Sequence, residues 1–572
     1  MILAFIMMFI TGYSGIVSRF SGPLVFGLSA FLPLGVGLFV LLFFSYALIS
    51  KYPSIALVCV FSGFLLKYVM PYYVFDGYVN YDTPIHYLSA LYLRDYGLSL
   101  GYHYHSWPSS LFLSNIFATI SGFSFPYDYS LIALTSRFLI PLSVYLISKR
   151  FLASSKSVLI AMAVLLIFEP YIIHPCPQIT AVALTTMALM VFISRHYREK
   201  HGWLYVLAVL GVSIVTYHAI MPIALALSIL AVLLFYDLIP RLGFTKSSRL
   251  TRYKKSRMWL MVIILVAIVA FYITYITPSI MRSIVKVLTS IIQGKEARLD
   301  VYPLSIESSE LKWQYYVIGN IRRVAVVLLL GIPSVIVALS LLTKYIMSRL
   351  SVSERVFLDV AIIASINALI YIVFGKLLNV GLVGRFYQLS YILSPILTAY
   401  FYENLSNISS QNSSRNFSIA HVKRAVSIIV LVSIFVFTPL SIFTSPPYIA
   451  LYIDAFGKPE LTSAQWIAEH LSASEVHLDG SIRLNQLIAL YLYPNNVYRI
   501  NLSITRYMEI KALKEDYSYT PGTIITTRKP LSTGASVVKG LSDAILARYI
   551  EKIPIYFNKL FSNDCCEIFM SR

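Results

Sequence analysis

Long apolar runs separated by short polar loops dominate this sequence of 572 residues. Each run approaches or exceeds the length that an α-helix needs to cross a hydrocarbon core of about 30 Å. With 58% hydrophobic and only 13% charged residues, the chain could not cover a soluble fold with polar groups. The pattern predicts a polytopic α-helical membrane protein with about 13 transmembrane helices. The predicted spans are residues 1–17, 28–50, 54–74, 130–148, 157–173, 178–194, 203–218, 219–238, 258–277, 323–343, 356–374, 384–401 and 425–444.

The basic residues indicate how the chain is oriented. The formal net charge is +20, but most Lys and Arg residues lie in short loops between apolar runs, so we expect no nucleic-acid partner. Such loops face the cytoplasm, which predicts a cell-membrane protein with a cytoplasmic N-terminus and an external C-terminal part. Run 1–17 lacks the basic start and cleavage site of a signal peptide, which favours a retained span. The basic loop residues are Lys149, Arg150, Lys156, Arg195, Arg198, Lys200, Arg241, Lys246, Arg249, Arg252, Lys254, Lys255, Arg257, Lys344, Arg349, Arg355, Lys423 and Arg424.

The sequence divides into two parts near residue 445. Residues 1–444 hold the apolar runs and form a transmembrane domain, with large loops 75–129 and 278–322 on the predicted outer side. After residue 445 the hydropathy falls, and short helix-like and strand-like pieces alternate. This alternation predicts a small α/β extracytoplasmic domain at residues 445–572.

Two kinds of pattern predict the elements of that C-terminal domain. Thr462 and Gln465 are spaced as in a capping box, which predicts a helix from Ser463. Runs rich in β-branched residues predict short strands. The predicted strands are Glu475–Leu478, Val497–Leu502, Gly522–Thr527 and Cys566–Met570.

The outer stretch of residues 75–87 places carboxylates and an imidazole just beyond an apolar run. If Asp82 opens a helix with Pro84 in its first turn, Asp82 and His86 lie four residues apart on one face. Their side chains would then point the same way. The alternative is that Asp82 or Thr83 is only an N-cap and His86 an ordinary polar residue of the first turn.

Further ionisable residues lie at the outer ends of other runs. Glu169 and His174 flank the end of run 157–173, His218 lies between two runs, and Arg385 begins run 384–401. Charged groups in the bilayer cost about 2.5–3.5 kcal/mol at a helix centre and are functional candidates. The alternatives are that Arg385 anchors to lipid headgroups and that His218 bonds a backbone carbonyl.

Arg137 lies inside run 130–148 and therefore needs a partner within the protein. Glu169, at the end of the next run, is the candidate partner that the sequence offers.

These features together resemble the C-type superfamily of integral-membrane glycosyltransferases (GT-C), in its archaeal and bacterial uncharacterised branch. The matching elements are Asp82-x-x-x-His86, Pro177-Gln178, Thr216-Tyr217-His218, Gly384-Arg385-Phe386 and Ala464-Gln465-Trp466-Ile467. The resemblance implies sugar transfer from a polyprenyl-phosphate carrier, a membrane lipid, to an extracytoplasmic acceptor that is a lipid, glycan or protein. It implies an inverting displacement with Asp82 as the catalytic base. The substrate-binding residues would be His86, Glu169, His174, Gln178, His218 and Arg385, with Arg385 on the donor phosphate.

The chemistry suits these residue types. A lipid phosphate is a good leaving group, so transfer needs cations to hold it and a carboxylate to take the acceptor's proton. Family members differ in their need for a divalent metal, and this chain offers only Glu169 and His174 at its second outer turn. The four cysteines show no metal-type spacing. The sequence therefore assigns no metal ligand and leaves the cofactor open.

Two other functions remain open from the sequence. One is a polytopic transporter or lipid flippase, which often shows internal repeats and charges near the midplane; no clear repeat is visible, and the candidate charges gather at one face. The other is a catalytically inactive GT-C-like assembly factor.

Overall fold

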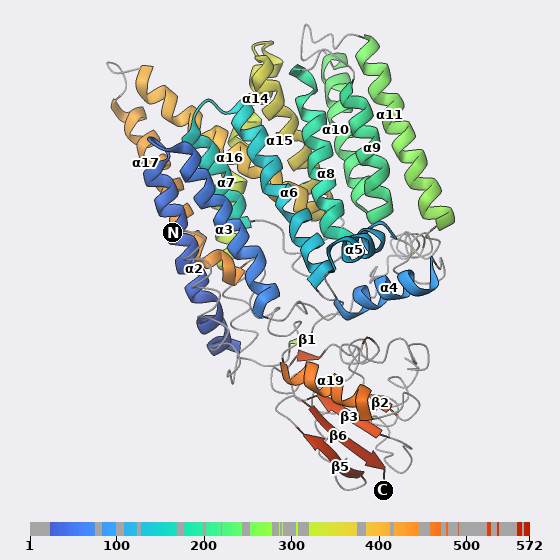
Figure 1. Cartoon of the computed structure of the whole chain (residues 1–572). Coiled ribbons are helices and arrows are strands. Elements are labelled where there is room, and N and C mark those ends of the chain that lie inside the picture. The colour runs from blue at the N-terminus through green and yellow to red at the C-terminus, as the bar shows by residue number, and fades with distance from the viewer. Residues whose placement is uncertain are drawn as a thin grey trace.

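The computed structural model describes most of the apolar part of the chain and short pieces of the rest (Figure 1). The described residues are 23–74, 83–98, 108–122, 127–168, 177–197, 202–218, 220–242, 252–276, 305–306, 320–373, 385–411, 417–444, 458–470, 476–478, 523–527, 535–536, 557–562 and 566–571, with 285, 289 and 490 as single positions.

The apolar runs are helical. Helices coincide with the predicted runs from residue 28 onward, whereas run 1–17 lies outside the described residues. Their bounds are α2 (Pro23–Leu48), α3 (Pro53–Val74), α6 (Tyr127–Phe151), α7 (Ser155–Phe168), α8 (Pro177–Ile193), α9 (Gly202–Tyr217), α10 (Ile220–Arg241), α11 (Arg252–Phe271), α14 (Ile332–Ile346), α15 (Val352–Ile370), α16 (Phe386–Gln411) and α17 (Phe417–Thr444), with π-helical turns η4 (Tyr272–Ile276) and η5 (Val327–Gly331).

Four of the described helical stretches are long and apolar enough to cross a membrane: Leu131–Phe151, Ile220–Arg241, Asn320–Ile346 and Val352–Val373. Shorter apolar helices of the same bundle accompany them. The protein is therefore a multi-pass membrane protein. The number of 13 crossings stays a prediction.

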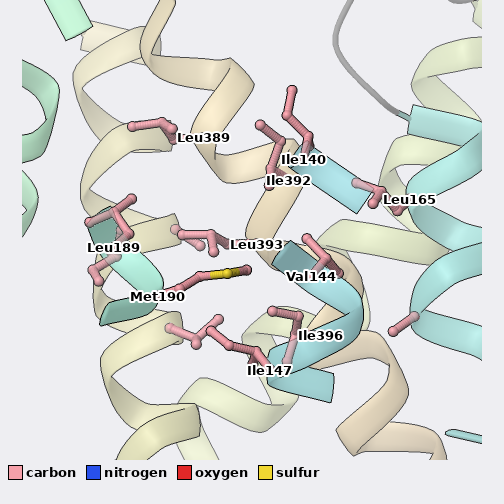
Figure 2. Packing of buried hydrophobic residues seen from close by; sticks show 14 of the residues in the cluster. Ile140, Val144, Ile147, Leu165, Leu189, Met190, Leu389, Ile392, Leu393 and Ile396 are labelled. Atoms are coloured by element: carbon pink, nitrogen blue, oxygen red, sulfur yellow. The ribbon is translucent and has the colours of Figure 1, made fainter. Parts of the chain in front are cut away.

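Helix α16 lies inside the bundle and organises the core. It packs against α7, α14, α15 and α17. Figure 2 shows its residues Leu389, Ile392, Leu393 and Ile396 between side chains of α6, α7 and α8. All four are 0% exposed. The position of α16 therefore fixes where its N-terminal residues lie.

Small polar side chains join the helices across the apolar core. Asn367 of α15 donates to Ser228 of α10 at 2.8 Å, and Thr180 of α8 donates to Ser136 of α6 at 2.9 Å. Ser390 of α16 donates to the carbonyl oxygen of Ala364 at 2.8 Å. Lipid offers no competing partner to these groups, and such bonds contribute about 0.6 kcal/mol each on average. They set the rotation of each helix toward its neighbour.

Residues 75–129 contain two short helices, α4 (Thr83–Tyr96) and α5 (Pro108–Ser121). The side-chain amide of Asn115 in α5 donates to the Ala90 carbonyl of α4 at 2.9 Å. Ser109 at the start of α5 donates to Thr216 of α9 at 2.7 Å. Helix α4 begins at Thr83, one residue after the predicted start at Asp82. Helix α5 is bonded both to α4 and to helix α9 of the bundle.

The C-terminal part contains a helix and a small sheet. Helix α19 (Lys458–His470) begins five residues before the predicted Ser463, because Pro459 already suits the first helical turn. The strands are β2 (Val476–Leu478), β3 (Thr523–Thr527), β5 (Phe557–Ser562) and β6 (Cys566–Ser571), in the order β2-β3-β6-β5.

The sheet matches the predicted strands in part. Strands β2, β3 and β6 lie where strands were predicted, whereas 497–502 lies outside the described residues. Strand β5 was not predicted, because a bulge between Lys559 and Phe561 breaks its alternation. Among the strands that the structure describes, β2 and β3 pair in parallel and the other pairs are antiparallel.

A two-residue strand links the second outer loop to the C-terminal part. Strand β1 (Ser305–Ile306) pairs antiparallel with β4 (Ala535–Ser536). In Figure 1, the C-terminal strands and α19 lie beyond the end of the bundle at which α4 and α5 lie. Helices α4 and α5, strand β1 and the described C-terminal strands thus lie at one end of the molecule.

Arg195 corrects one assignment made from the sequence. We expected it in a basic cytoplasmic loop, but it lies in the 3₁₀ turn η3 (Ser194–Tyr197) with its side chain 4% exposed. Its Nη1 atom is 2.6 Å from Oδ2 of the fully buried Asp359 in α15. The guanidinium also lies 3.9 Å from the ring centroid of Phe192. Helix packing, which the hydropathy pattern does not encode, brings the carboxylate to it.

We predict that breaking this ion pair destabilises the protein more than replacing it. Asp359→Leu leaves a buried guanidinium without its carboxylate and should cost about 3–5 kcal/mol. The double variant Arg195→Met with Asp359→Leu should recover much of that loss, because neither charge remains buried. Thermal unfolding of the detergent-purified variants shows which of them is more stable. A double variant no more stable than Asp359→Leu alone would contradict it.

Candidate functional site

The N-termini of α8 and α16 meet at a small polar network. The Arg385 Nε atom donates to the Gln178 side-chain oxygen at 3.3 Å, and the Gln178 amide donates to the Gln388 side-chain oxygen at 3.4 Å. Gln178 is 8% exposed and Gln388 5%. Both glutamines therefore orient Arg385 from within the protein.

Local sequence explains why this network sits at two helix starts. Pro177 occupies the first position of α8, where its missing N–H costs nothing. Arg385 immediately precedes the first residue of α16. Free N–H groups and the helix dipole give each helix start partial positive charge. Together with the guanidinium, they favour an anion here.

His218 lies next to this network, at the junction between α9 and α10 and outside both helices. Its Nδ1 atom accepts a hydrogen bond from the backbone N–H of Ile220 at 3.2 Å. Surrounding protein atoms lower the pKa of the imidazole to about 3, with a further contribution from the positive charge of Arg385. The imidazole is therefore neutral at physiological pH, and Arg385 carries the charge.

Aromatic rings and a second arginine lie further along the face of α16. The ring centroids of Tyr371 and Tyr387 are 5.0 Å apart, and those of Tyr387 and Tyr391 are 5.1 Å apart. The Arg322 guanidinium lies 5.7 Å from the Tyr391 centroid. Phe168, the last residue of α7, also approaches Tyr391, at 6.2 Å. This combination suits an anionic group attached to a ring or an apolar chain.

Two further cations lie buried in the C-terminal half of α3 and the N-terminal half of α6. Lys67 is 5% exposed, and its ammonium donates to the Leu166 carbonyl of α7 at 2.5 Å. Arg137 is 3% exposed, and its guanidinium lies 4.2 Å from the Tyr68 ring centroid. The sequence singled out Arg137 but proposed Glu169 as its partner, and Glu169 lies outside the described residues.

The structure brings some of the predicted site residues together, whereas others lie outside the described residues. It brings Gln178, His218 and Arg385 together. His86 lies on α4 and is 3% exposed, so it is a buried side chain and not a solvated one. Asp82, Glu169 and His174 lie outside the described residues, and their roles stay predictions.

Sequence reasoning missed Gln388, Lys67 and Arg322. Gln388 could have been found as a polar residue one helical turn after Arg385 in an apolar run, and Lys67 as a charge inside a span. Within the part of the chain that the structure describes, no group of three His, Cys, Asp or Glu residues could hold a metal ion.

Comparisons with known proteins give a structural likeness without a sequence match. No protein-family model matches the sequence, and no curated protein matches it. The chain is similar to a crystal structure of ArnT from Cupriavidus metallidurans in the apo state, with 12% identity and a TM-score of 0.48 over 90% of this chain and 97% of that chain. The structure of ArnT from the same organism bound to undecaprenyl phosphate matches with 12% identity, a TM-score of 0.44 and the same coverage. We base the proposal below on the residues of the site and not on this likeness.

We predict that His218 makes the protein less stable at acid pH. The imidazole titrates near pH 6.5 in the unfolded chain and near pH 3 in the folded one. As the pH falls below 6.5, the unfolded state binds a proton that the folded state does not, so stability is lost progressively toward pH 3. At about pH 5 the loss should reach about 2 kcal/mol. Thermal unfolding of wild type and His218→Gln at about pH 7.5 and pH 5 measures it; an equal acid-induced loss in both would contradict the assignment.

Proposed function

We propose that this protein is a membrane glycosyltransferase that moves a sugar from a polyprenyl-phosphate donor to an extracytoplasmic acceptor. The observation that supports this most is the Arg385 guanidinium, oriented by buried Gln178 and Gln388 where two helices begin. A neutral imidazole and a row of tyrosines border it. This arrangement suits a phosphate whose attached chain lies in the membrane.

The transfer follows from the roles of the residues. The acceptor oxygen forms a bond to the anomeric carbon of the sugar while the bond from that carbon to the phosphate oxygen breaks. Arg385 compensates the charge that develops on the leaving phosphate. Asp82 takes the proton from the acceptor hydroxyl, and attack opposite the leaving group inverts the anomeric centre. Gln178 holds the guanidinium and is itself held by Gln388, and His86, Glu169 and His174 bind substrate nearby.

We further propose that the site faces the outside of the cell. The basic loops lie at the other ends of the helices, which the positive-inside rule assigns to the cytoplasm. The pairing of β1 with β4 supports a shared side for loop 278–322 and the C-terminal part. Residues 445–572 then form an extracytoplasmic α/β domain, with the N-terminus of the chain in the cytoplasm.

Two rival functions would use the same cations. A lipid flippase would bind the carrier phosphate without transferring sugar, and an inactive family member would bind it as an assembly factor. A transfer assay with a polyprenyl-phosphate sugar separates all three, because only the enzyme releases polyprenyl phosphate in step with glycosylated acceptor.

We predict that Asp82→Asn abolishes transfer without unfolding the protein. Asn caps a helix about as well as Asp but cannot accept a proton, so transfer should fall by about 10²- to 10⁴-fold. Gel filtration checks folding, and single-turnover sugar transfer measures the rate. Full activity in a folded Asp82→Asn variant would leave the residue as a cap and make Asp76 the next candidate.

We predict that Arg385→Ala weakens binding of the donor phosphate by about 10- to 100-fold, the effect of losing a charge-assisted hydrogen bond. Binding of undecaprenyl phosphate to the purified protein measures this. The matched control is Arg323→Ala, because Arg323 is an exposed arginine bonded to Asn320; it should bind as wild type does. Unchanged affinity in Arg385→Ala would identify Arg385 as a lipid anchor.

A further inference from the structure

An apolar groove runs between α6 and α8 at the end of the bundle away from Arg385. Its volume is about 580 Å³, within the range of small-molecule sites. Leu146, Met187 and Val191 line its apolar part. Leu146 is 55% exposed, as expected of a side chain that faces lipid and not the protein core.

The groove ends at polar and positively charged side chains. Lys149 and Arg150, the basic residues of the last turn of α6, line it together with Ser194. Both cations are exposed, and the Lys149 ammonium lies 5.6 Å from the Tyr145 ring centroid. An apolar channel with two cations at its mouth is complementary to an acyl chain that carries an anionic headgroup.

This groove is separate from the proposed active site. Helix α8 connects the two, with Gln178 at the site and Ser194 just beyond its other end. At 1.5 Å per residue, these positions are about 24 Å apart. The groove therefore opens toward the opposite leaflet from the one that would hold the donor phosphate.

We propose that this groove binds an anionic glycerophospholipid of the leaflet that faces the basic loops. One acyl chain lies along Leu146, Met187 and Val191, and the phosphodiester contacts Lys149 and Arg150. Basic pockets between transmembrane helices on the cytoplasmic side commonly bind such headgroups.

A second groove beside α6 differs from the first in the residues that line it. It lies between α3 and α6, has a volume of about 510 Å³ and is lined by apolar and hydroxyl side chains such as Leu57, Phe61 and Tyr145. No charged residue lines it. The Lys149 ammonium lies 5.6 Å from the ring of Tyr145 at its edge, but Lys149 and Arg150 both line the α6–α8 groove, so the proposal concerns that groove.

Native mass spectrometry of the full-length protein, released from nanodiscs of equal phosphatidylglycerol and phosphatidylcholine, tests the proposal. Wild type should retain phosphatidylglycerol in preference to phosphatidylcholine. The double variant Lys149→Gln with Arg150→Gln should lose that preference by on the order of 30-fold, since each cation near the surface contributes about fivefold. Val191→Trp, which fills the groove, should lower retention of the phosphatidylglycerol molecule.

Two controls make the outcome decisive. Arg349→Gln with Arg355→Gln removes the same charge from the connection before α15 and the first turn of that helix, outside the groove, and should retain the lipid. Lys149→Arg with Arg150→Lys preserves both charges and should bind as wild type does. Equal retention in wild type and the Gln double variant would overturn the proposal. So would an equal loss in the Arg349/Arg355 control, because the preference would then reflect overall charge only.

Discussion

The central position of α16 is the constraint on which the rest of this structure depends. A helix with fully buried Leu389, Ile392 and Leu393 cannot rotate or slide without opening voids against α6, α7 and α8. Gln388, and Arg385 just before the helix, are therefore held in place by packing that begins at the next residue, Leu389. In the proposed function, a guanidinium so fixed is pre-organised to meet the donor phosphate, which is the condition for electrostatic stabilisation of a leaving group.

Several polar groups inside the bundle bond a neighbouring helix, because lipid cannot hydrogen-bond to them. Asn367, Ser390 and Thr180 each do so, and Arg195 pairs with Asp359. At the other end of α8, the Arg385 side chain donates to the neutral Gln178, which donates in turn to Gln388. These neutral side chains orient the guanidinium of Arg385, whereas a carboxylate faces that of Arg195.

The two ends of the helices have different chemistry. One end combines Arg385, a neutral His218, tyrosines and the short helices α4 and α5, which suits the proposed handling of a charged substrate attached to a membrane chain. The opposite end carries exposed cations such as Lys149 and Arg150 beside the α6–α8 groove. Helix α8 spans from one to the other, so it connects the proposed active site to the proposed lipid site.

The sequence by itself determined the helical membrane class, the positions of the apolar helices and the start of α4, because hydropathy and the first-turn preference of proline are local properties. It also identified Gln178, His218 and Arg385 as polar residues at run ends. Only the tertiary structure joined these three, added Gln388 and Lys67, and moved Arg195 from a loop into a buried pair with Asp359. The reason is physical: which helix faces put their polar groups together depends on packing between segments far apart in the chain, and no local pattern records it.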